Sequence, residues 1–163
     1  MPVGFPPQAS PDARILILGT MPSAASLQKH QYYGNPNNAF WPIVFSLWNE
    51  PLPDDYDARV QFLAMHRIAL WDVLRLCDRE GSADAAIRQP HPNDFVAFAR
   101  EHPCIHTLFF NSTNAAVFYR KLVIPDPFAA AEKHTLPSTS PARAMRFEAK
   151  RELWLPLRRA AKG

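Results

Sequence analysis

The feature that most limits what this chain can fold into is a short apolar run that ends on a glycine, RILILGT at residues 14–20. A run of branched apolar residues of this length predicts a buried strand. The segment that follows, MPSAASLQKHQYYGNPNNAFW at residues 21–41, is polar, aromatic and interrupted by prolines. An open α/β sheet has its ligand crevice at the carboxyl ends of its strands, so this segment is the first candidate for a binding site.

Further apolar runs and helical periodicities alternate along the rest of the chain. Strands are predicted at 68–74 (IALWDVL), 105–110 (IHTLFF) and, more weakly, 133–136. Helices are predicted from about Asn38, over 58–66, from an Asn93 cap to Glu101, over 114–121 and from 141 to 155, where Pro156 bends or restarts the last one. Residues 77–92 are predicted to be a polar excursion with one helical turn, and residues 1–13 an extended segment on the first strand.

This alternation predicts the α/β class, with helices on both faces of a sheet. We expect a single domain over residues 1–163, because 163 residues are about one domain's worth. This domain should have three layers, α/β/α, with a central, mainly parallel four-stranded sheet. The longest apolar runs fall short of the roughly 18 residues that a membrane span needs. The amino terminus lacks the charged and apolar regions of a secretory signal. We therefore expect a cytoplasmic protein that does not bind membranes.

Cysteine and histidine usage gives no indication of a metal. Cys77 and Cys104 are the two cysteines, which excludes a four-cysteine cluster within one chain, and the six histidines show no HxxxH spacing. Neither a GxxxxGKS phosphate loop nor a GxSxG elbow occurs, and five glycines do not form a dinucleotide fingerprint. We expect no metal and no cofactor.

Basic charge is gathered at one end of the chain. Residues 133–163 contain eight Lys or Arg against Glu148 and Glu152, a net charge of +6, so the total of +3 leaves −3 for residues 1–132. Such clustering is typical of a phosphate-binding face, but a solvated helix face gives the same pattern. Charge alone favours the solvated face.

Three polar loops should meet at one edge of the predicted sheet, because right-handed crossovers bring the carboxyl ends of parallel strands together. They follow the first, third and fourth predicted strands: residues 21–41, 111–116 (NSTNAA) and 136–144 (LPSTSPARA). Tyr33, Asn38 and Asn111 are therefore expected to converge although they are far apart in the sequence.

Four motifs, in this order and on these loops, resemble the uracil-DNA glycosylase superfamily. They are GTMPS (19–23), YYGNPNNAFW (32–41), FFNSTNAA (109–116) and LPSTSPARA (136–144). The likeness is greatest to the branch that removes hypoxanthine and uracil from DNA, the DNA-deoxyinosine glycosylases. The opening GFPP, the central ALWDVL and the PNDF segment are similar to that branch too, so the resemblance covers nearly the whole chain.

The resemblance implies a role for individual residues. Most branches have a catalytic Asp or Asn where this chain has Met21, and in the hypoxanthine-removing branch the catalytic amide is instead the residue that matches Asn38. Tyr33 matches the aromatic that stacks on the extruded base, and Asn111 the asparagine that reads its polar edge. Met21, Pro22 and Ser23 would bind the base, with the backbone N–H groups of Met21 and Ser23 on one of its carbonyl oxygens. The last motif is implied to enter the minor groove, with contacts from Ser138, Thr139, Ser140, Pro141 and Arg143.

At two places the chain departs from the pattern of related sequences, and both departures bear on substrate preference. Gly34 and Asn35 stand where related sequences often have Ala-His, and Ser112 stands where FNG is commoner than FNS and a glycine would allow close backbone approach. Leu136 also replaces a polar residue of other branches.

The chemistry of such a site can be argued from the residues. Breaking an N-glycosidic bond places positive charge on the sugar and negative charge on the departing base, so the site needs a positioned water and donors aimed at the base. Asn38 can position a water, but a neutral amide is a poor base. No lysine in these motifs is placed to form a Schiff base, which predicts a monofunctional glycosylase that acts on flipped-out hypoxanthine or uracil.

Structural roles compete with these assignments. Asn38 is also a good helix cap, Asn111 an ordinary turn residue at a strand end and Tyr33 a packing residue. Asp72, at the end of the second predicted strand, could face the crevice, but a helix cap or a structural hydrogen bond is favoured for it. Three other functions stay open: a G:U or G:T mismatch-specific glycosylase, a catalytically weak DNA-damage-binding protein and a nucleoside hydrolase.

Damaged DNA is the expected partner of the protein. We expect no obligate protein partner and a monomeric chain. The sequence leaves open the preferred base, the opposite base and the strandedness of the substrate.

Overall fold

The apolar run at residues 14–20 forms a central strand on which the rest of the sheet is built. In the computed structural model, which describes residues 1–162, β1 (Ile15–Gly19) pairs in parallel with β2 (Ile68–Asp72) on one side and with β5 (Thr107–Phe110) on the other. β6 (Glu132–Thr135) adds in parallel to β5, so the strand order is β2-β1-β5-β6. The predicted α/β class and four-stranded parallel sheet are confirmed.

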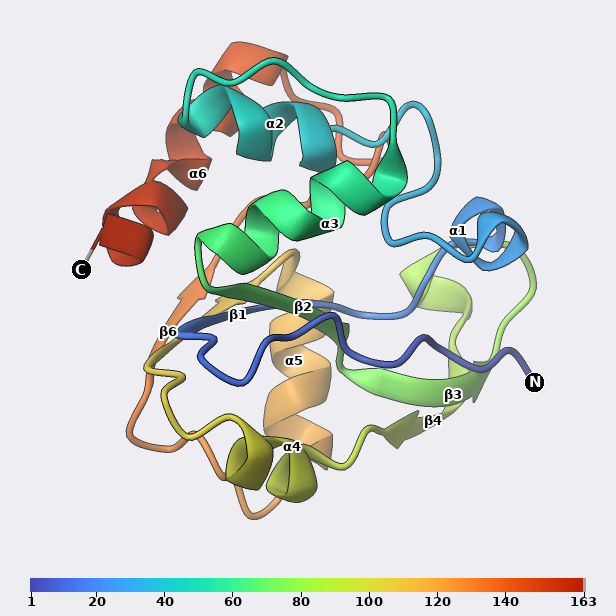
Figure 1. Cartoon of the computed structure of the whole chain (residues 1–163). Helices are drawn as coiled ribbons and strands as arrows, with labels where there is room; N and C mark the ends of the chain where they lie inside the picture. Colours follow the sequence, from blue (N-terminus) through green and yellow to red (C-terminus); the bar gives the residue numbers. More distant parts are fainter. Residues whose placement is uncertain (163) are drawn as a thin grey trace.

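Alternate residues of β1 belong to two hydrophobic cores, one on each face of the sheet. Ile15 and Ile17 pack with α2 (Phe40–Leu47), α3 (Tyr56–Met65) and α6 (Phe147–Lys162). Leu16 and Leu18 pack with α4 (Phe95–Glu101) and α5 (Thr113–Leu122) on the opposite face. Figure 1 shows these two helical layers above and below the sheet. The strands are buried on both sides, which explains their unbroken apolar sequences.

A small antiparallel hairpin lies beside the main sheet, where the sequence predicted one strand followed by a polar excursion. The run predicted as a strand at 68–74 ends at Asp72 in β2, and Leu74 begins β3 (Leu74–Asp78), which pairs with β4 (Arg88–Pro92). The predicted helical turn is present between them as η1 (Asp84–Ala86). A short helix, α1 (Ala24–Lys29), was not predicted. Both omissions fall in polar segments without a clear apolar period.

Three other boundaries differ from the prediction. The last helix begins at Phe147 rather than near 141 and continues through Pro156, because residues 141–146 belong to the irregular loop between β6 and the helix. Asp94, not Asn93, caps α4, since its carboxylate accepts the Ala97 N–H; the Asn93 amide donates to Asp72 O instead. The amino-terminal segment lies along β2 rather than β1, through Gln8 paired with Leu70.

Within residues 1–162 no helix is long and apolar enough to cross a membrane. The same residues contain no group of three or more His, Cys, Asp or Glu side chains arranged to hold a metal ion.

Candidate active site

A cavity of about 1120 Å³ opens at the carboxyl edge of the parallel sheet. Its lining combines the ends of β1, β2 and β5 with the three loops that the sequence singled out. All of the predicted site residues line it: Met21, Pro22, Ser23, Tyr33, Asn38, Asn111, Ser138, Thr139, Ser140, Pro141 and Arg143. The expected convergence of Tyr33, Asn38 and Asn111 is therefore observed.

Asn38 lies at the entry to α2 and combines a structural contact with a half-buried position in the cavity wall. Its Oδ1 accepts the Phe40 N–H at 2.9 Å, which satisfies one of the free donors at the start of the helix. A carbonyl oxygen has two lone pairs, so Oδ1 retains one, and the Nδ2 donors add to it. Ala39, not Asn38, is the N-cap residue of α2, so Asn38 stabilises the start of the helix from one residue before the cap. This bond and a contact with a substrate are compatible in one side chain.

Asn111 follows β5 and is tied to the loop after β6. Its Nδ2 donates to Thr139 Oγ1 and its Oδ1 accepts the Thr139 N–H, both at 2.9 Å, and the side chain is buried. The Thr139 carbonyl oxygen accepts the Ala39 N–H at 3.0 Å. Each amide atom of Asn111 therefore has one partner already and can make one further hydrogen bond.

The loop at residues 138–143 forms the exposed rim of the cavity and is shaped by its own hydroxyl groups. Ser138 Oγ accepts the Ser140 N–H, and Ser140 Oγ accepts the Ala142 N–H. Pro141 and Arg143 are exposed, whereas Thr139 is buried with an exposed fraction of 1%. Within this loop, Thr139 holds the rim in place, and the residues after it face solvent.

Tyr33 reaches the cavity from the segment between α1 and α2. Its ring stacks on Phe40 with 4.0 Å between centroids and an interplanar angle of 18°, so one face of the ring is covered by protein. Its backbone has a φ of 55°, a left-handed conformation that non-glycine residues rarely adopt. Burial and the nearby Asp72 carboxyl group raise the pKa of the Tyr33 phenol well above its ordinary range. The phenol is therefore a neutral donor at physiological pH.

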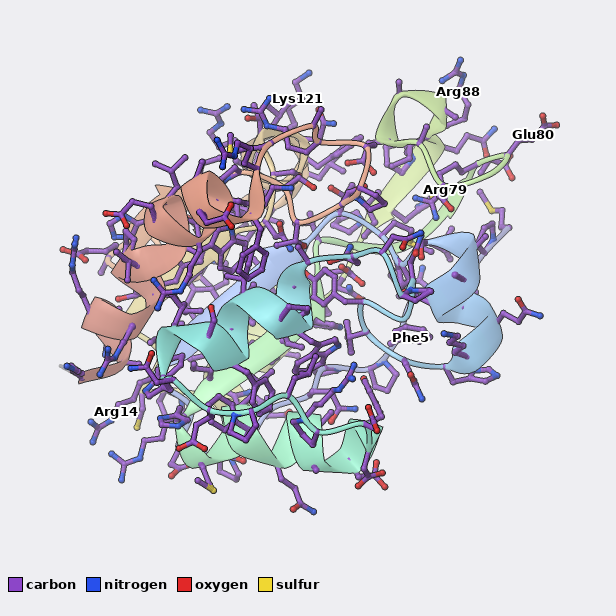
Figure 2. The ribbon with its side chains drawn as sticks, turned by 90° about the horizontal axis from the view of Figure 1, so that it is seen from above. Phe5, Arg14, Arg79, Glu80, Arg88 and Lys121 are labelled. Atoms are coloured by element: carbon purple, nitrogen blue, oxygen red, sulfur yellow. The ribbon has the colours of Figure 1, made fainter. Side chains whose placement is uncertain are left out.

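The segment Met21 to Ser23 is fixed by contacts of its own. Met21 is buried, Ser23 Oγ caps α1 by accepting the Ser26 N–H at 3.1 Å, and the Pro22 carbonyl oxygen accepts from Arg79 Nη2. Arg79 lies with Glu80 and Arg88 at the hairpin side of the molecule, where the latter two extend into solvent (Figure 2).

The cavity wall contains polar groups that the sequence analysis did not assign to the site. Asp72, favoured above as a structural hydrogen-bonding group, lines the cavity with an exposed fraction of 5%, and its Oδ2 has no hydrogen-bond partner among residues 1–162. Thr20 Oγ1 donates to Asp84 Oδ2 at 3.1 Å, so η1 forms part of the wall. In the sequence, the position of Asp72 at the end of a predicted strand indicated that it could lie at the site. No sequence pattern indicated the same for Asp84.

Two basic residues of the carboxyl-terminal cluster have structural contacts rather than free surface. Lys150 is buried and its Nζ donates to the Arg143 carbonyl oxygen at 3.1 Å, which anchors the end of the rim loop. Arg151 donates to Ser46 Oγ and to the Ser46 carbonyl oxygen, joining α6 to α2. Arg143, in the rim loop, and Arg146, three residues after it, are exposed.

The model of one protein family, described as the uracil DNA glycosylase superfamily, matches residues 6–158 of the chain. The chain belongs to the uracil DNA glycosylase superfamily. Two similar proteins are named hypoxanthine DNA glycosylase. The one from Methanosarcina acetivorans is 39% identical over 150 residues, 91% of this chain and 92% of that protein, and the one from Methanosarcina barkeri is 36% identical over 116 residues, 71% and 73%.

A solved structure extends the superfamily likeness to the backbone. It is a solution NMR structure of a Methanosarcina acetivorans protein, provisionally described as a uracil DNA glycosylase. It superposes with a TM-score of 0.84 at 35% identity and covers 99% of this chain and 98% of that one. The family that the four motifs predicted is confirmed.

Proposed function

We propose that this chain is a monofunctional DNA glycosylase that removes hypoxanthine, uracil or both from DNA. The observation that carries the proposal is the meeting of Tyr33, Asn38 and Asn111, from distant parts of the sequence, in one cavity at the sheet edge. The names of the two Methanosarcina relatives support hypoxanthine as a substrate. The cavity, about 1120 Å³, is slightly larger than the roughly 300–1,000 Å³ usual for small-molecule sites, which leaves room for a flipped-out nucleotide.

The reaction breaks the bond between the base nitrogen and C1′ of the deoxyribose. The bonding electron pair leaves with the base, the oxygen of a water molecule bonds to C1′, and the water loses a proton to the departing base or to solvent. Asn38 Oδ1, which has a lone pair left beside its bond to Phe40, is proposed to orient that water. A neutral amide contributes position rather than proton abstraction.

The base would enter between Tyr33 and the ends of the strands, while the sugar and phosphates stay at the rim. Asn111 would use its remaining donor and acceptor on the base edge, and the backbone of Met21 and Ser23 would hold a carbonyl oxygen of the base. Ser138, Ser140, Pro141 and Arg143 would contact the DNA backbone and fill the vacated stack, with Thr139 holding this loop in place. Water is the one co-reactant proposed, with a monomeric chain and no protein partner.

No lysine lines the cavity within residues 1–162, which supports hydrolysis without a Schiff base on the sugar. The product would then be an intact strand with an abasic site that breaks only after alkali. Sodium borohydride trapping tests this point: a covalent protein–DNA adduct would contradict the monofunctional assignment.

The function is tested with oligonucleotides that contain one deoxyinosine or one deoxyuridine, single-stranded and paired with each of the four bases. Excess protein should generate alkali-labile sites in at least one of them. A panel that includes G:U and G:T pairs also tests the mismatch-specific alternative, which predicts release of uracil or thymine from these pairs alone.

A DNA-damage-binding protein without turnover is a second candidate. The observation in its favour is that Met21 and Leu136 are apolar and buried in the cavity wall, at positions where other branches place polar catalytic residues. Tight binding of the lesion-containing oligonucleotides without base release would favour this candidate.

A further inference from the structure

The connection between β3 and β4 brings a carboxylate to the cavity wall. Asp84 begins η1 and lines the cavity with a half-buried side chain. Its Oδ2 accepts from Thr20 Oγ1 at 3.1 Å and from Asn114 Nδ2 at 3.4 Å, as an ionised carboxylate does. Its Oδ1 has no hydrogen-bond partner within residues 1–162 and is accessible to solvent. No ion pair among these residues includes Asp84, so its negative charge is not compensated.

Asp84 lies over the crevice between β1 and β5. The strand order β2-β1-β5-β6 places the topological switch point between these two strands, and open α/β sheets bind their ligands there. Thr20 follows β1, and Asn114 lies in the first turn of α5 after β5, so the two hydrogen bonds of Asp84 span the crevice. Thr20 is buried and Asp84 is half-buried. The carboxylate is therefore nearer the mouth of the cavity than the end of β1.

The β3–β4 connection is fixed in place before any substrate binds. It lies beside α1 (Figure 1), where Ser82 Oγ accepts the Ala24 N–H at 2.9 Å and Arg79 donates to the Pro22 carbonyl oxygen. Ile87, directly after η1, is buried in the core. Asp84 is thus attached to the protein on both sides, and its charge has a fixed position in the wall.

This charge does not favour the binding of DNA. Proteins contact phosphates with cations and neutral donors, and a carboxylate that faces the DNA backbone repels it. The other carboxyl group of the cavity, Asp72, lies deeper, and its unpaired oxygen is buried. Asp84 is therefore the carboxylate of the wall that a substrate can reach, and it would be stabilised by a positive charge on that substrate.

Such a charge develops during hydrolysis of an N-glycosidic bond, on the deoxyribose. The sugar of a flipped nucleotide remains joined to its strand, so it stays near the mouth, at the level of Asp84. We propose that the Asp84 carboxylate is a catalytic residue that lies against this deoxyribose and stabilises the positive charge that develops at C1′. The inference rests on the proposed glycosylase function and adds a charge-stabilising group to it.

Asp84 forms no bond in this step. The electron pair of the bond between C1′ and the base nitrogen leaves with the base, and the oxygen of the water oriented by Asn38 bonds to C1′. The proton of that water goes to the departing base or to solvent, and Asp84 stays ionised throughout. A fixed charge in a wall that partly excludes water acts more strongly than one in bulk solvent. Asn38 thus supplies position, and Asp84 supplies charge.

The first test measures binding without turnover. In place of the target nucleotide, a duplex contains either a pyrrolidine, which is protonated at neutral pH, or an uncharged tetrahydrofuran of the same size. The ratio of the two Kd values reports the effect of charge at the sugar, because general changes in DNA affinity cancel. Wild type should prefer the pyrrolidine duplex by at least about tenfold, and Asp84→Asn should lose about tenfold of that preference. Asp78→Asn, which removes an exposed carboxylate of β3 outside the cavity, is the matched control and should keep the wild-type ratio.

The second test measures hypoxanthine release from a deoxyinosine duplex in single turnovers at saturating protein, which separates the chemical step from binding. Asp84→Asn should be slower by about 10- to 100-fold. It should bind the deoxyinosine duplex as tightly as wild type or more tightly, since a repulsive charge is lost. Asp78→Asn should match wild type. A wild-type rate in Asp84→Asn would overturn the proposal and leave Asp84 as a group that only repels the DNA backbone.

Thr20→Val separates the charge of Asp84 from its structural contacts. It removes the shorter hydrogen bond to Asp84 and keeps the carboxylate. This variant should retain the preference for the pyrrolidine duplex and most of the rate. If Thr20→Val loses as much rate as Asp84→Asn while both keep the wild-type preference for pyrrolidine, the effect belongs to the structure of the wall and the proposal is overturned.

Measurements on wild type alone cover the case that the variants do not fold. Equal affinity for the pyrrolidine and tetrahydrofuran duplexes would overturn the proposal without any variant. If wild type releases no base from deoxyinosine or deoxyuridine, the proposed function itself fails. That result comes from a different assay, so the two failures are distinguishable.

Discussion

Asn111 and Thr139 are joined by two hydrogen bonds of 2.9 Å, which use both ends of the Asn111 amide. Thr139 also accepts the Ala39 N–H through its carbonyl oxygen, so this buried threonine connects the end of β5 to the start of α2. The rim loop is thereby fixed to two walls of the cavity, independently of any DNA. A loop held in this way loses little conformational entropy when it binds a duplex.

Asn111→Ala should lower the free energy of unfolding by about 2–4 kcal/mol, because it leaves the N–H and the hydroxyl group of Thr139 buried without partners. Urea denaturation measures this change. Asn114→Ala, which removes an exposed amide three residues further along the chain in α5, is the control and should change stability by less than about 0.5 kcal/mol. Equal effects of the two substitutions would contradict the bridging role of Asn111.

Asn38→Ala should abolish base release while DNA binding remains, and should cost about 1 kcal/mol of stability through loss of the bond to the Phe40 N–H. Asn38→Ser separates these effects, since a serine oxygen can restore the helix cap but not the amide. We expect Asn38→Ser to recover stability without recovering activity. Near-normal single-turnover rates in either variant would leave Asn38 with only its structural role at the start of α2. Asn37→Ala, at an exposed neighbouring position, is the control.

Ser112→Gly should stabilise the protein by about 1 kcal/mol. Ser112 has a φ of 153°, where a side chain is strained and glycine is not. Its Oγ caps α5 by accepting the Ala115 N–H at 3.0 Å, but replacing a serine cap by glycine costs only a few tenths of a kcal/mol. A thermal denaturation series with Ser112→Ala as control measures the difference, and a Ser112→Gly protein less stable than wild type would show that the cap outweighs the strain.

The pH dependence of stability should contain a contribution from Asp72. Burial raises its pKa from 3.8 to about 7, so the folded protein binds more protons than the unfolded chain between these values. The free energy of unfolding therefore falls as pH rises through this window, and the cost is complete above about pH 7. Between pH 5 and pH 8, the free energy of unfolding should fall by about 2 kcal/mol less in Asp72→Asn than in wild type. Parallel curves for the two proteins, measured by urea denaturation, would contradict the burial of an ionisable group there.

The sequence predicted the elements whose apolar period is strong and missed those whose pairing is settled by tertiary contacts. The β1 run and the three loops at its edge were predictable because a parallel sheet brings strand ends together whatever the intervening residues are. The β3–β4 hairpin was not, since β4 consists of Arg88–Pro92, a polar stretch with two prolines that has no strand pattern of its own.

The same distinction holds within the site. Resemblance identified Asn38 and Asn111 as polar groups of the cavity, but only coordinates show that Thr139 already occupies one position on each amide atom of Asn111. Asp72 was visible at a strand end, yet its missing partner depends on what surrounds it in space, and no sequence pattern reports that.

The measurement that tests the central claim most directly is base release from a deoxyinosine-containing oligonucleotide by excess wild-type protein, with Asn38→Ala alongside. We predict alkali-labile sites at the lesion with wild type, an intact strand before alkali treatment, and no product with Asn38→Ala. An absence of abasic sites with wild type, on deoxyinosine and deoxyuridine in both single and double strands, would contradict the glycosylase assignment.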